Sequence, residues 1–174
     1  MHYMLLPLKR YAEFSGRSRR MEYWMFFLFQ ALVSTALMIL LISVGGAALF
    51  SGGDPTALAA AGGSFMLIMG LYGLFSLAML IPSIAVGVRR LHDTNRTGWW
   101  LLAPLAPYIL MFVAVGLSAS SPDSGAAGIL AMVGGLAVLA LGITLLVFMF
   151  LEGTRGPNRY GPDPKGRAPA EVFA

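Results

Sequence analysis

Cysteine is absent from the 174 residues of the sequence, and charged residues are scarce, at 11%. Without cysteine there is no disulfide framework, no thiolate metal site and no cysteine nucleophile. A soluble domain carries about 25% charged residues, and a chain of this size has too much surface to cover with about half that share. Hydrophobic residues make up 57% of the chain, the reverse of the balance typical of disorder. This composition indicates a membrane protein.

The sequence contains two long stretches that are almost free of charge. Asp54 is the only charged residue between Glu22 and Arg89, and Asp123 is the only one between Arg96 and Glu152. Each of the two acids lies among Gly, Pro and Ser, a composition typical of turns. The turns divide the stretches into four apolar segments, at roughly 23–50, 63–88, 98–117 and 126–151.

Each segment reaches the roughly 20 residues that a membrane-spanning helix needs. The alternating pattern of a membrane barrel is missing. We therefore predict an all-α, multi-pass bundle of four transmembrane helices. A cleaved signal peptide is the competing interpretation of the first segment, since Ala57-Leu58-Ala59 resembles a cleavage site. The segment is much longer than the roughly 7–15 apolar residues of a signal peptide, which favours a retained helix.

The basic residues are distributed unequally among the loops. Five of the twelve precede the first segment, three lie between the second and third, and four follow the last. The other two loops contain none. The positive-inside rule therefore predicts that both termini and the central loop lie in the cytoplasm.

Other residues refine this prediction. Aromatic residues that favour the headgroup level open two of the helices, at Tyr23, Trp24, Trp99 and Trp100. Pro104 and Pro107 are expected to kink the third helix, and Pro82 the second. Ala127, Ala131 and Gly135 recur at four-residue spacing, which indicates either a close helix contact or only general richness in small residues.

Three polar motifs lie on the predicted cytoplasmic side. Residues 16–24 read Gly-Arg-Ser-Arg-Arg-Met-Glu-Tyr-Trp, and residues 89–100 read Arg-Arg-Leu-His-Asp-Thr-Asn-Arg-Thr-Gly-Trp-Trp. Residues 152–164 read Glu-Gly-Thr-Arg-Gly-Pro-Asn-Arg-Tyr-Gly-Pro-Asp-Pro. Over about residues 9–164 the chain resembles the bacterial inner-membrane family called domain of unknown function 805. Asn95 and Thr97 stand where glycine and serine are common in that family. The resemblance implies a small multi-pass inner-membrane protein and no established activity.

The second motif contains the one candidate for chemistry. Asp93 could orient His92, as carboxylates orient catalytic or metal-bound imidazoles. The interpretation that we favour is that this loop is a topology signal whose acid neutralises some of its arginines. An anionic headgroup site is the next alternative, expected where Arg17 and Arg89–Arg90 converge. We predict no catalytic residue, no metal site and no cofactor.

The spans themselves have no Asp, Glu, Lys, Arg or His at their centres, which disfavours ion-coupled transport. The most polar deep side chain is Gln30, which is expected to bond between helices. We therefore predict a non-enzymatic structural or interaction protein whose basic cytoplasmic cap contacts anionic lipid headgroups or a protein partner, with no role for nucleic acid. The alternative is a small transporter or channel-like protein, which could also form a homo-oligomer.

We expect a tail at 1–15, a four-helix domain with its polar cap at 16–164, and a flexible tail at 165–174. The candidate cap residues share a polar or charged side chain within the three motifs. They are Arg17, Arg20, Glu22, Arg89, Arg90, His92, Asp93, Arg96, Asn158, Arg159 and Asp163.

Overall fold

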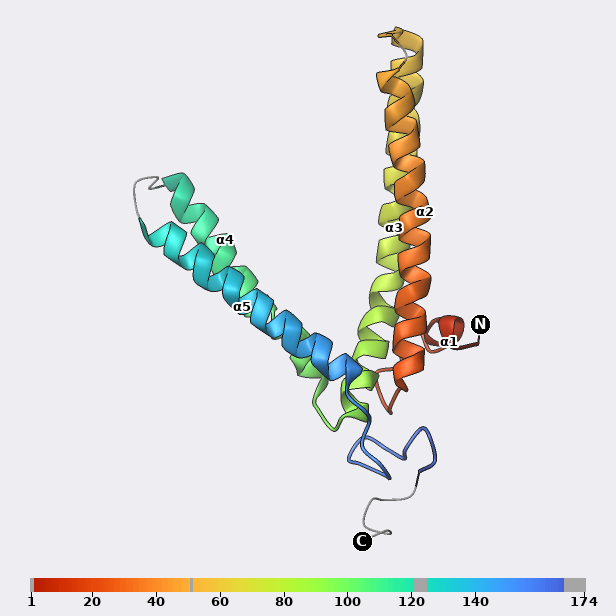
Figure 1. The fold of residues 1–174 in the computed structure, drawn as a ribbon, viewed down its shortest axis with the longest axis vertical. Helices are drawn as coiled ribbons and strands as arrows, with labels where there is room; N and C mark the ends of the chain where they lie inside the picture. The colour runs from red at the N-terminus through yellow and green to blue at the C-terminus, as the bar shows by residue number, and fades with distance from the viewer. Residues whose placement is uncertain (1, 51, 121–124, 168–174) are drawn as a thin grey trace. The chain divides into compact units, whose positions relative to one another are not determined.

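The structure is a computed structural model, and it describes residues 2–50, 52–120 and 125–167. Its elements in chain order are α1 (His2–Lys9), α2 (Arg20–Leu49), α3 (Pro55–Asp93), the 3₁₀ helix η1 (Gly98–Leu102), α4 (Leu105–Ser120) and α5 (Gly125–Phe150) (Figure 1). The described residues contain no β-strand, only an isolated bridge between Asn158 and Gly161. The all-helical fold class is thus confirmed, whereas Asp123 lies outside the described residues.

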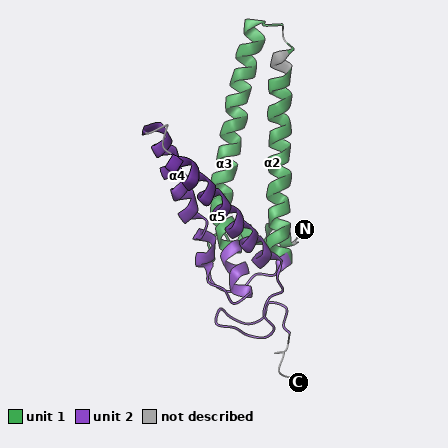
Figure 2. Ribbon diagram, turned by 60° about the vertical axis from the view of Figure 1, so that its left-hand side comes forward, with its two compact units in different colours: residues 1–13, 21–86 green, residues 14–20, 87–174 purple. Residues whose placement is uncertain are grey.

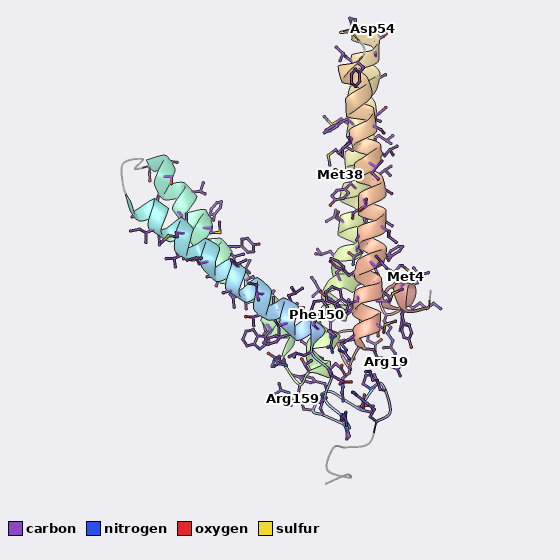
Figure 3. The ribbon with its side chains drawn as sticks, viewed as in Figure 1. Met4, Arg19, Met38, Asp54, Phe150 and Arg159 are labelled. Atoms are coloured by element: carbon purple, nitrogen blue, oxygen red, sulfur yellow. The ribbon has the colours of Figure 1, made fainter. Side chains whose placement is uncertain are left out.

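Four helical segments are long and apolar enough to cross a membrane: Arg20–Gly46, Pro55–Asp93, Gly98–Ser120 and Gly125–Phe150. Their outward side chains are largely apolar (Figure 3); Phe112 is 79% exposed and Met66 72%. Lipid is the solvent that accepts such surfaces, and only a helix satisfies its own backbone there. The chain is therefore a multi-pass membrane protein.

The chain divides into two compact units (Figure 2). Unit 1 comprises residues 1–13 and 21–86, and so holds α1, most of α2 and most of α3. Unit 2 comprises residues 14–20 and 87–174, with the last residues of α3, then η1, α4 and α5. All three polar motifs reach into unit 2, and its polar groups are described below by themselves.

Helix α3 is longer than its apolar segment, with 39 residues. At 1.5 Å per residue it extends about 58 Å, nearly twice the hydrocarbon thickness. Part of this additional length lies at the start of α3, which follows Asp54, labelled in Figure 3. The Thr56 backbone N–H and hydroxyl donate to Asp54 Oδ1 at 3.0 and 2.8 Å, and these bonds lower the pKa of the Asp54 carboxyl. Asp54 is thus an N-cap followed by proline at the first helical position.

Proline affects the helices differently from the sequence prediction. The predicted third helix is divided, because η1 ends at Leu102 and α4 begins at Leu105, on either side of Pro104. Pro107 then lies in the first turn of α4, where its missing N–H has no helical partner to lose. Helix α3, in contrast, continues through Pro82.

Within unit 1, polar contacts join elements far apart in sequence. Ser83 Oγ lies 3.1 Å from Gln30 Oε1, so the deep glutamine does bond between α2 and α3. The Tyr11 hydroxyl donates to the Ala78 carbonyl at 2.7 Å, and Pro7 is fully buried. The segment expected to be a tail with few anchors therefore contains a helix, α1, and two points of attachment.

In unit 2, α4 packs against α5 around a glycine. A Cβ atom at Gly134 would lie 2.7 Å from Met111 Cγ and 3.3 Å from the Pro107 carbonyl oxygen. A Cβ at the neighbouring Gly135 would meet nothing within 4 Å. Small residues do allow a close helix contact here. The contact includes Gly134, one position before the expected Gly135, and Ala127 of the expected stripe is buried as well.

Candidate functional site: an arginine-rich polar cap

Residues 16–20, 89–97 and 152–167 of unit 2 form one connected group of polar contacts, which we call the polar cap. The Ser18 backbone N–H donates to the Arg89 carbonyl at 3.1 Å, and the Thr154 N–H donates to the Asp93 carbonyl at 2.9 Å. These two bonds connect the first and third motifs to the end of α3. Segments separated by more than 60 residues in the chain thus meet in one structure.

Asp93 is the centre of the polar cap. Arg17 Nε donates to Asp93 Oδ1 at 3.0 Å, and Arg90 Nη1 donates to Asp93 Oδ2 at 2.7 Å. The side chains are 1%, 0% and 6% exposed for Arg17, Arg90 and Asp93. Both carboxylate oxygens thus receive a charge-assisted hydrogen bond from a buried guanidinium, the strong kind of hydrogen bond that a buried ion pair requires.

The remaining donors of Arg17 hold the chain that follows α5. Arg17 Nη2 donates to the Thr154 carbonyl at 2.6 Å, and Nη1 donates to the Gly156 carbonyl at 2.8 Å, with the Gly161 carbonyl 3.4 Å away. Arg19 Nε adds a bond to the Pro164 carbonyl at 2.8 Å. A single buried guanidinium therefore shapes a segment that has no regular secondary structure.

Arg90 and Arg20 donate hydrogen bonds to the carbonyl groups at the C-terminal end of α5. Arg90 Nε donates to the Met149 carbonyl at 3.3 Å, Arg90 Nη2 donates to the Leu151 carbonyl, and Arg20 Nη1 donates to the Phe150 carbonyl at 3.2 Å. The last carbonyls of a helix have no partner within it and carry partial negative charge. Arg90 therefore neutralises Asp93 and caps α5 with the same side chain.

A glycine allows the chain to pass Asp93. Gly153 is buried, and a Cβ atom there would lie 2.0 Å from Asp93 Oδ2 and 2.4 Å from its Cγ. No side chain fits at that separation. The close approach of Asp93 of the second motif thus explains why residue 153 of the third motif is a glycine.

His92 has different partners from those that a catalytic pair would need. Its Nδ1 lies 3.2 Å from the Gly16 carbonyl oxygen, which can only accept, so Nδ1 carries the proton. The ring stacks on Tyr160 with centroids 3.8 Å apart and an angle of 4°. Both Asp93 oxygens are bonded to arginines instead. The geometry therefore does not favour the hypothesis that Asp93 orients His92.

Helix α3 ends in a Schellman motif that places Arg96. The Arg96 N–H donates to the Leu91 carbonyl at 2.9 Å and the Asn95 N–H donates to the His92 carbonyl at 3.0 Å. Asn95 has φ 59°, the left-handed conformation that glycine and, less often, asparagine adopt at this position. The resemblance had already marked Asn95 as a site where glycine is common.

The third motif is held by its own polar residues. Asn158 Nδ2 donates to the His92 carbonyl at 2.9 Å, and Asn158 and Gly161 exchange both backbone bonds at 3.0 Å. Arg167 Nε and the Lys165 N–H donate to Asp163 at 2.8 and 2.9 Å. Burial raises the pKa of the Asp163 carboxyl, but these hydrogen bonds outweigh it and lower the pKa to about 2. Residues 165–167, expected in a flexible tail, are thus attached; 168–174 lie outside the described residues.

The remaining candidates are placed as follows. Arg89 is fully buried in unit 2, and Glu22, only 3% exposed, lies in unit 1 with Tyr23 and Trp24. Trp99 and Trp100 lie in η1 in unit 2. Arg17 and Arg90 do converge, as expected of a headgroup site, but on Asp93 and on backbone carbonyls. In the described ranges no group of three or more His, Asp or Glu is placed to hold a metal ion.

Sequence reasoning missed several residues that shape the polar cap, namely Gly153, Thr154, Tyr160, Phe148 and Arg167. Gly153, Thr154 and Tyr160 stand inside the third motif, so the motif itself was the available signal. Phe148 and Arg167 lie outside the motifs, and only the fold reveals their contacts.

The comparisons with known proteins agree with this description. The model of the family "Protein of unknown function (DUF805)" matches residues 11–162. Inner membrane protein YhaI of Escherichia coli strain K12 is 33% identical over 165 residues, which cover 95% of this chain and 97% of YhaI. Inner membrane protein YhaH of the same strain is 32% identical over 165 residues, covering 95% of this chain and 98% of YhaH. No solved structure matches the chain. The chain therefore belongs to the DUF805 family of proteins of unknown function.

Proposed function

We propose that this protein is a non-enzymatic inner-membrane protein whose polar cap lies in the cytoplasm and contacts anionic lipid headgroups. The observation that carries the proposal is positive charge on the cap that no carboxylate of the described residues neutralises. Arg96, Arg155 and Arg159 form no ion pair with any carboxylate of residues 2–50, 52–120 and 125–167.

The acids of unit 2 that form ion pairs do so with other basic residues. Asp93 is shared by Arg17 and Arg90, Asp163 by Arg167 and the Lys165 N–H, and Glu152 by Arg20, Lys165 and Arg167. Because the three arginines named above are not paired with acids of the described residues, they give the polar cap a net positive surface. Each basic residue near an anionic leaflet contributes about 1 kcal/mol to its attraction.

Orientation follows from the distribution of charge. All twelve Lys and Arg residues lie at or beyond the ends of the spans that carry the three motifs, and the positive-inside rule assigns such ends to the cytoplasm. YhaI and YhaH are inner membrane proteins by name. Both termini are then cytoplasmic.

The geometry supports a non-enzymatic role. The residues with acid–base chemistry, His92 and Asp93, are engaged in holding the cap together, through Gly16, Tyr160 and the two buried arginines. A catalytic pair would instead place the carboxylate on the imidazole beside an open site.

The test is lipid retention measured by native mass spectrometry after incorporation into nanodiscs of mixed phosphatidylethanolamine and phosphatidylglycerol. We expect the wild type to retain phosphatidylglycerol in excess of its share, with less excess at high salt. The triple variant Arg96→Gln, Arg155→Gln, Arg159→Gln should lose that excess.

Arg10→Gln is the control, because Arg10 is exposed but already paired with Glu13 at 3.5 Å. It should retain lipid as the wild type does. A wild type that retains the two lipids in proportion to their supply contradicts the proposal. So does a protein partner that copurifies in their place.

A further inference from the structure

Two of the unneutralised arginines meet at one turn of the polar cap. Arg96 Nη1 donates to the Thr94 carbonyl at 3.3 Å, and Arg159 Nη2 donates to the Asn95 carbonyl at 3.1 Å. Thr94 and Asn95 are consecutive, so guanidinium groups from segments 63 residues apart in the chain lie on neighbouring carbonyl oxygens. Figure 3 labels Arg159 in the segment that follows α5.

Each of these guanidinium groups also lies against an aromatic ring. Arg96 Cζ is 4.0 Å from the centre of the Phe148 ring, and Arg159 Cζ is 4.7 Å from the centre of the Tyr160 ring. Stacking fixes the plane of a guanidinium and leaves its edges for hydrogen bonding. Each group has five N–H donors, of which the bonds to Thr94 and Asn95 use one apiece. The free edges are suited to the oxygens of a phosphate.

A shallow groove begins directly after Arg96. It is lined by Thr97, Trp99, Trp100 and Ala103, with a volume of about 270 Å³. Trp99 is 76% exposed, and Trp100 packs edge-on against Phe148, the ring that carries Arg96. The groove lies at the start of the apolar segment Gly98–Ser120, so the arginine turn and the tryptophan groove stand where a span meets its headgroup region.

We infer that Arg96 and Arg159 bind the phosphate of a phospholipid, whose glycerol and upper acyl chains lie in the groove formed by Thr97, Trp99, Trp100 and Ala103. This inference rests on the proposed function and assigns the headgroup contact to one place. A free inorganic phosphate matches the arginines but has nothing to fill an apolar groove. A phospholipid has both parts in the required order.

This assignment differs from the site that the sequence suggests. Arg17 and Arg90 are buried and donate to Asp93 and to backbone carbonyls, so their hydrogen bonds are committed inside the fold. Arg96 is half-buried and Arg159 is exposed. They are therefore the pair that a lipid can reach.

The experiment compares charge-matched variants in phosphatidylglycerol-containing nanodiscs by native mass spectrometry. Arg96→Gln with Arg159→Gln removes two charges at the turn, whereas Arg10→Gln with Lys165→Gln removes two charges that are already paired with Glu13 and Glu152. Because a hydrogen bond between charged groups contributes more than a neutral one, we expect the first pair to weaken retention about tenfold. The second pair should stay within about twofold, as diffuse attraction is spread over the surface.

A second pair of variants keeps the charge and protects the test against a folding defect. Arg96→Lys with Arg159→Lys preserves net charge but loses the planar fork and its stacking, so retention should still fall severalfold. Unchanged retention in this variant would overturn the inference. Equal losses in the two glutamine pairs would also overturn it, while leaving the proposed function standing.

Inorganic phosphate distinguishes the two sources of the ligand. Excess inorganic phosphate, at an ionic strength matched with chloride, should not displace phosphatidylglycerol from the wild type. Displacement would show that the turn binds free phosphate and would contradict a phospholipid site. A wild type without any preference for the anionic lipid would contradict the proposed function itself.

Discussion

Asp93 shows how a charged side chain can be buried in the polar cap. Its two oxygens each receive a guanidinium, and the remaining donors of Arg17 and Arg90 meet carbonyl oxygens of Thr154, Gly156, Met149 and Leu151. Burying a charge is unfavourable unless it is paired and hydrogen-bonded. Removing one member therefore leaves the others buried without compensation.

Asp93→Asn should lower the free energy of unfolding by about 3–5 kcal/mol, because two arginines lose their shared carboxylate. Thermal unfolding in detergent, followed by tryptophan fluorescence, measures the loss. Glu152→Gln is the matched control, since the Glu152 side chain is 51% exposed and an exposed pair contributes only about 0–1 kcal/mol. Equal stability of the two variants would contradict a structural role for Asp93.

Asp163 adds a pH dependence to the same region. Its pKa is lowered from 3.8 to about 2, so its stabilising contribution is complete above about pH 4 and is lost as the pH falls toward 2. Hydrogen exchange at the Lys165 and Gly166 amides, which donate to Asp163, should accelerate over that interval after correction for the intrinsic rate. In Asp163→Asn the protection should be weaker at neutral pH and show no such transition. A transition centred on pH 4 or above in the wild type would contradict the lowered pKa.

Individual residues of the polar cap could be named from the sequence, but their partners could not. Arg17 and Asp93 stand 76 positions apart, and nothing local distinguishes Arg17 from Arg19 or Arg20. The buried pair is selected by long-range packing around Gly153, which only the fold reveals. Asn95 is the opposite case, because its left-handed turn follows from residues next to it.

Among the elements, α4 and α5 offer the clearest comparison of two neighbouring positions. Gly134 is buried against Met111 and Pro107, whereas a Cβ atom added at Gly135 would meet nothing within 4 Å. Because alanine favours a helix over glycine by about 1 kcal/mol, Gly135→Ala should be neutral or stabilising. Gly134→Ala should instead destabilise by about 1–3 kcal/mol, the usual effect of overpacking.

Chemical denaturation of the two alanine variants in the same detergent measures this difference. Gly134→Ala as stable as Gly135→Ala would show that α4 and α5 do not approach at Gly134. The comparison is internal, since both substitutions add the same methyl group to the same helix.

The four helical segments were predictable because the apolar runs between charges are long, and composition alone limits what a bilayer accepts. Their ends were less predictable. Asp54-Pro55 was interpreted as a turn, although it is also an N-cap followed by a first-turn proline, and α3 begins there. At Pro104 the sequence indicates a kink, whereas the structure has a break between η1 and α4. A proline lacks the N–H that the helix needs, and this loss can either kink or break a helix.

At the scale of the whole molecule, the distribution of basic residues predicts a topology. Reporter fusions at Gly53 and Ser124 should indicate the periplasm, and fusions at Asn95 and Ala174 the cytoplasm, because every basic residue lies at one set of ends. Ser124 and Ala174 lie outside the described residues, so these fusions rest on the sequence. A cytoplasmic signal at Ser124 would contradict four spans.

The proposed function requires that the polar cap faces the cytoplasm, where anionic lipid is available to it. Because the chain has no cysteine, Arg155→Cys on the cap and Gly53→Cys between α2 and α3 each introduce a unique thiol. The most direct measurement is labelling of these two variants with a membrane-impermeant thiol reagent, in right-side-out and in inverted membrane vesicles. We expect Arg155→Cys to be labelled only in inverted vesicles and Gly53→Cys only in right-side-out vesicles. Labelling of Arg155→Cys in right-side-out vesicles would contradict this orientation.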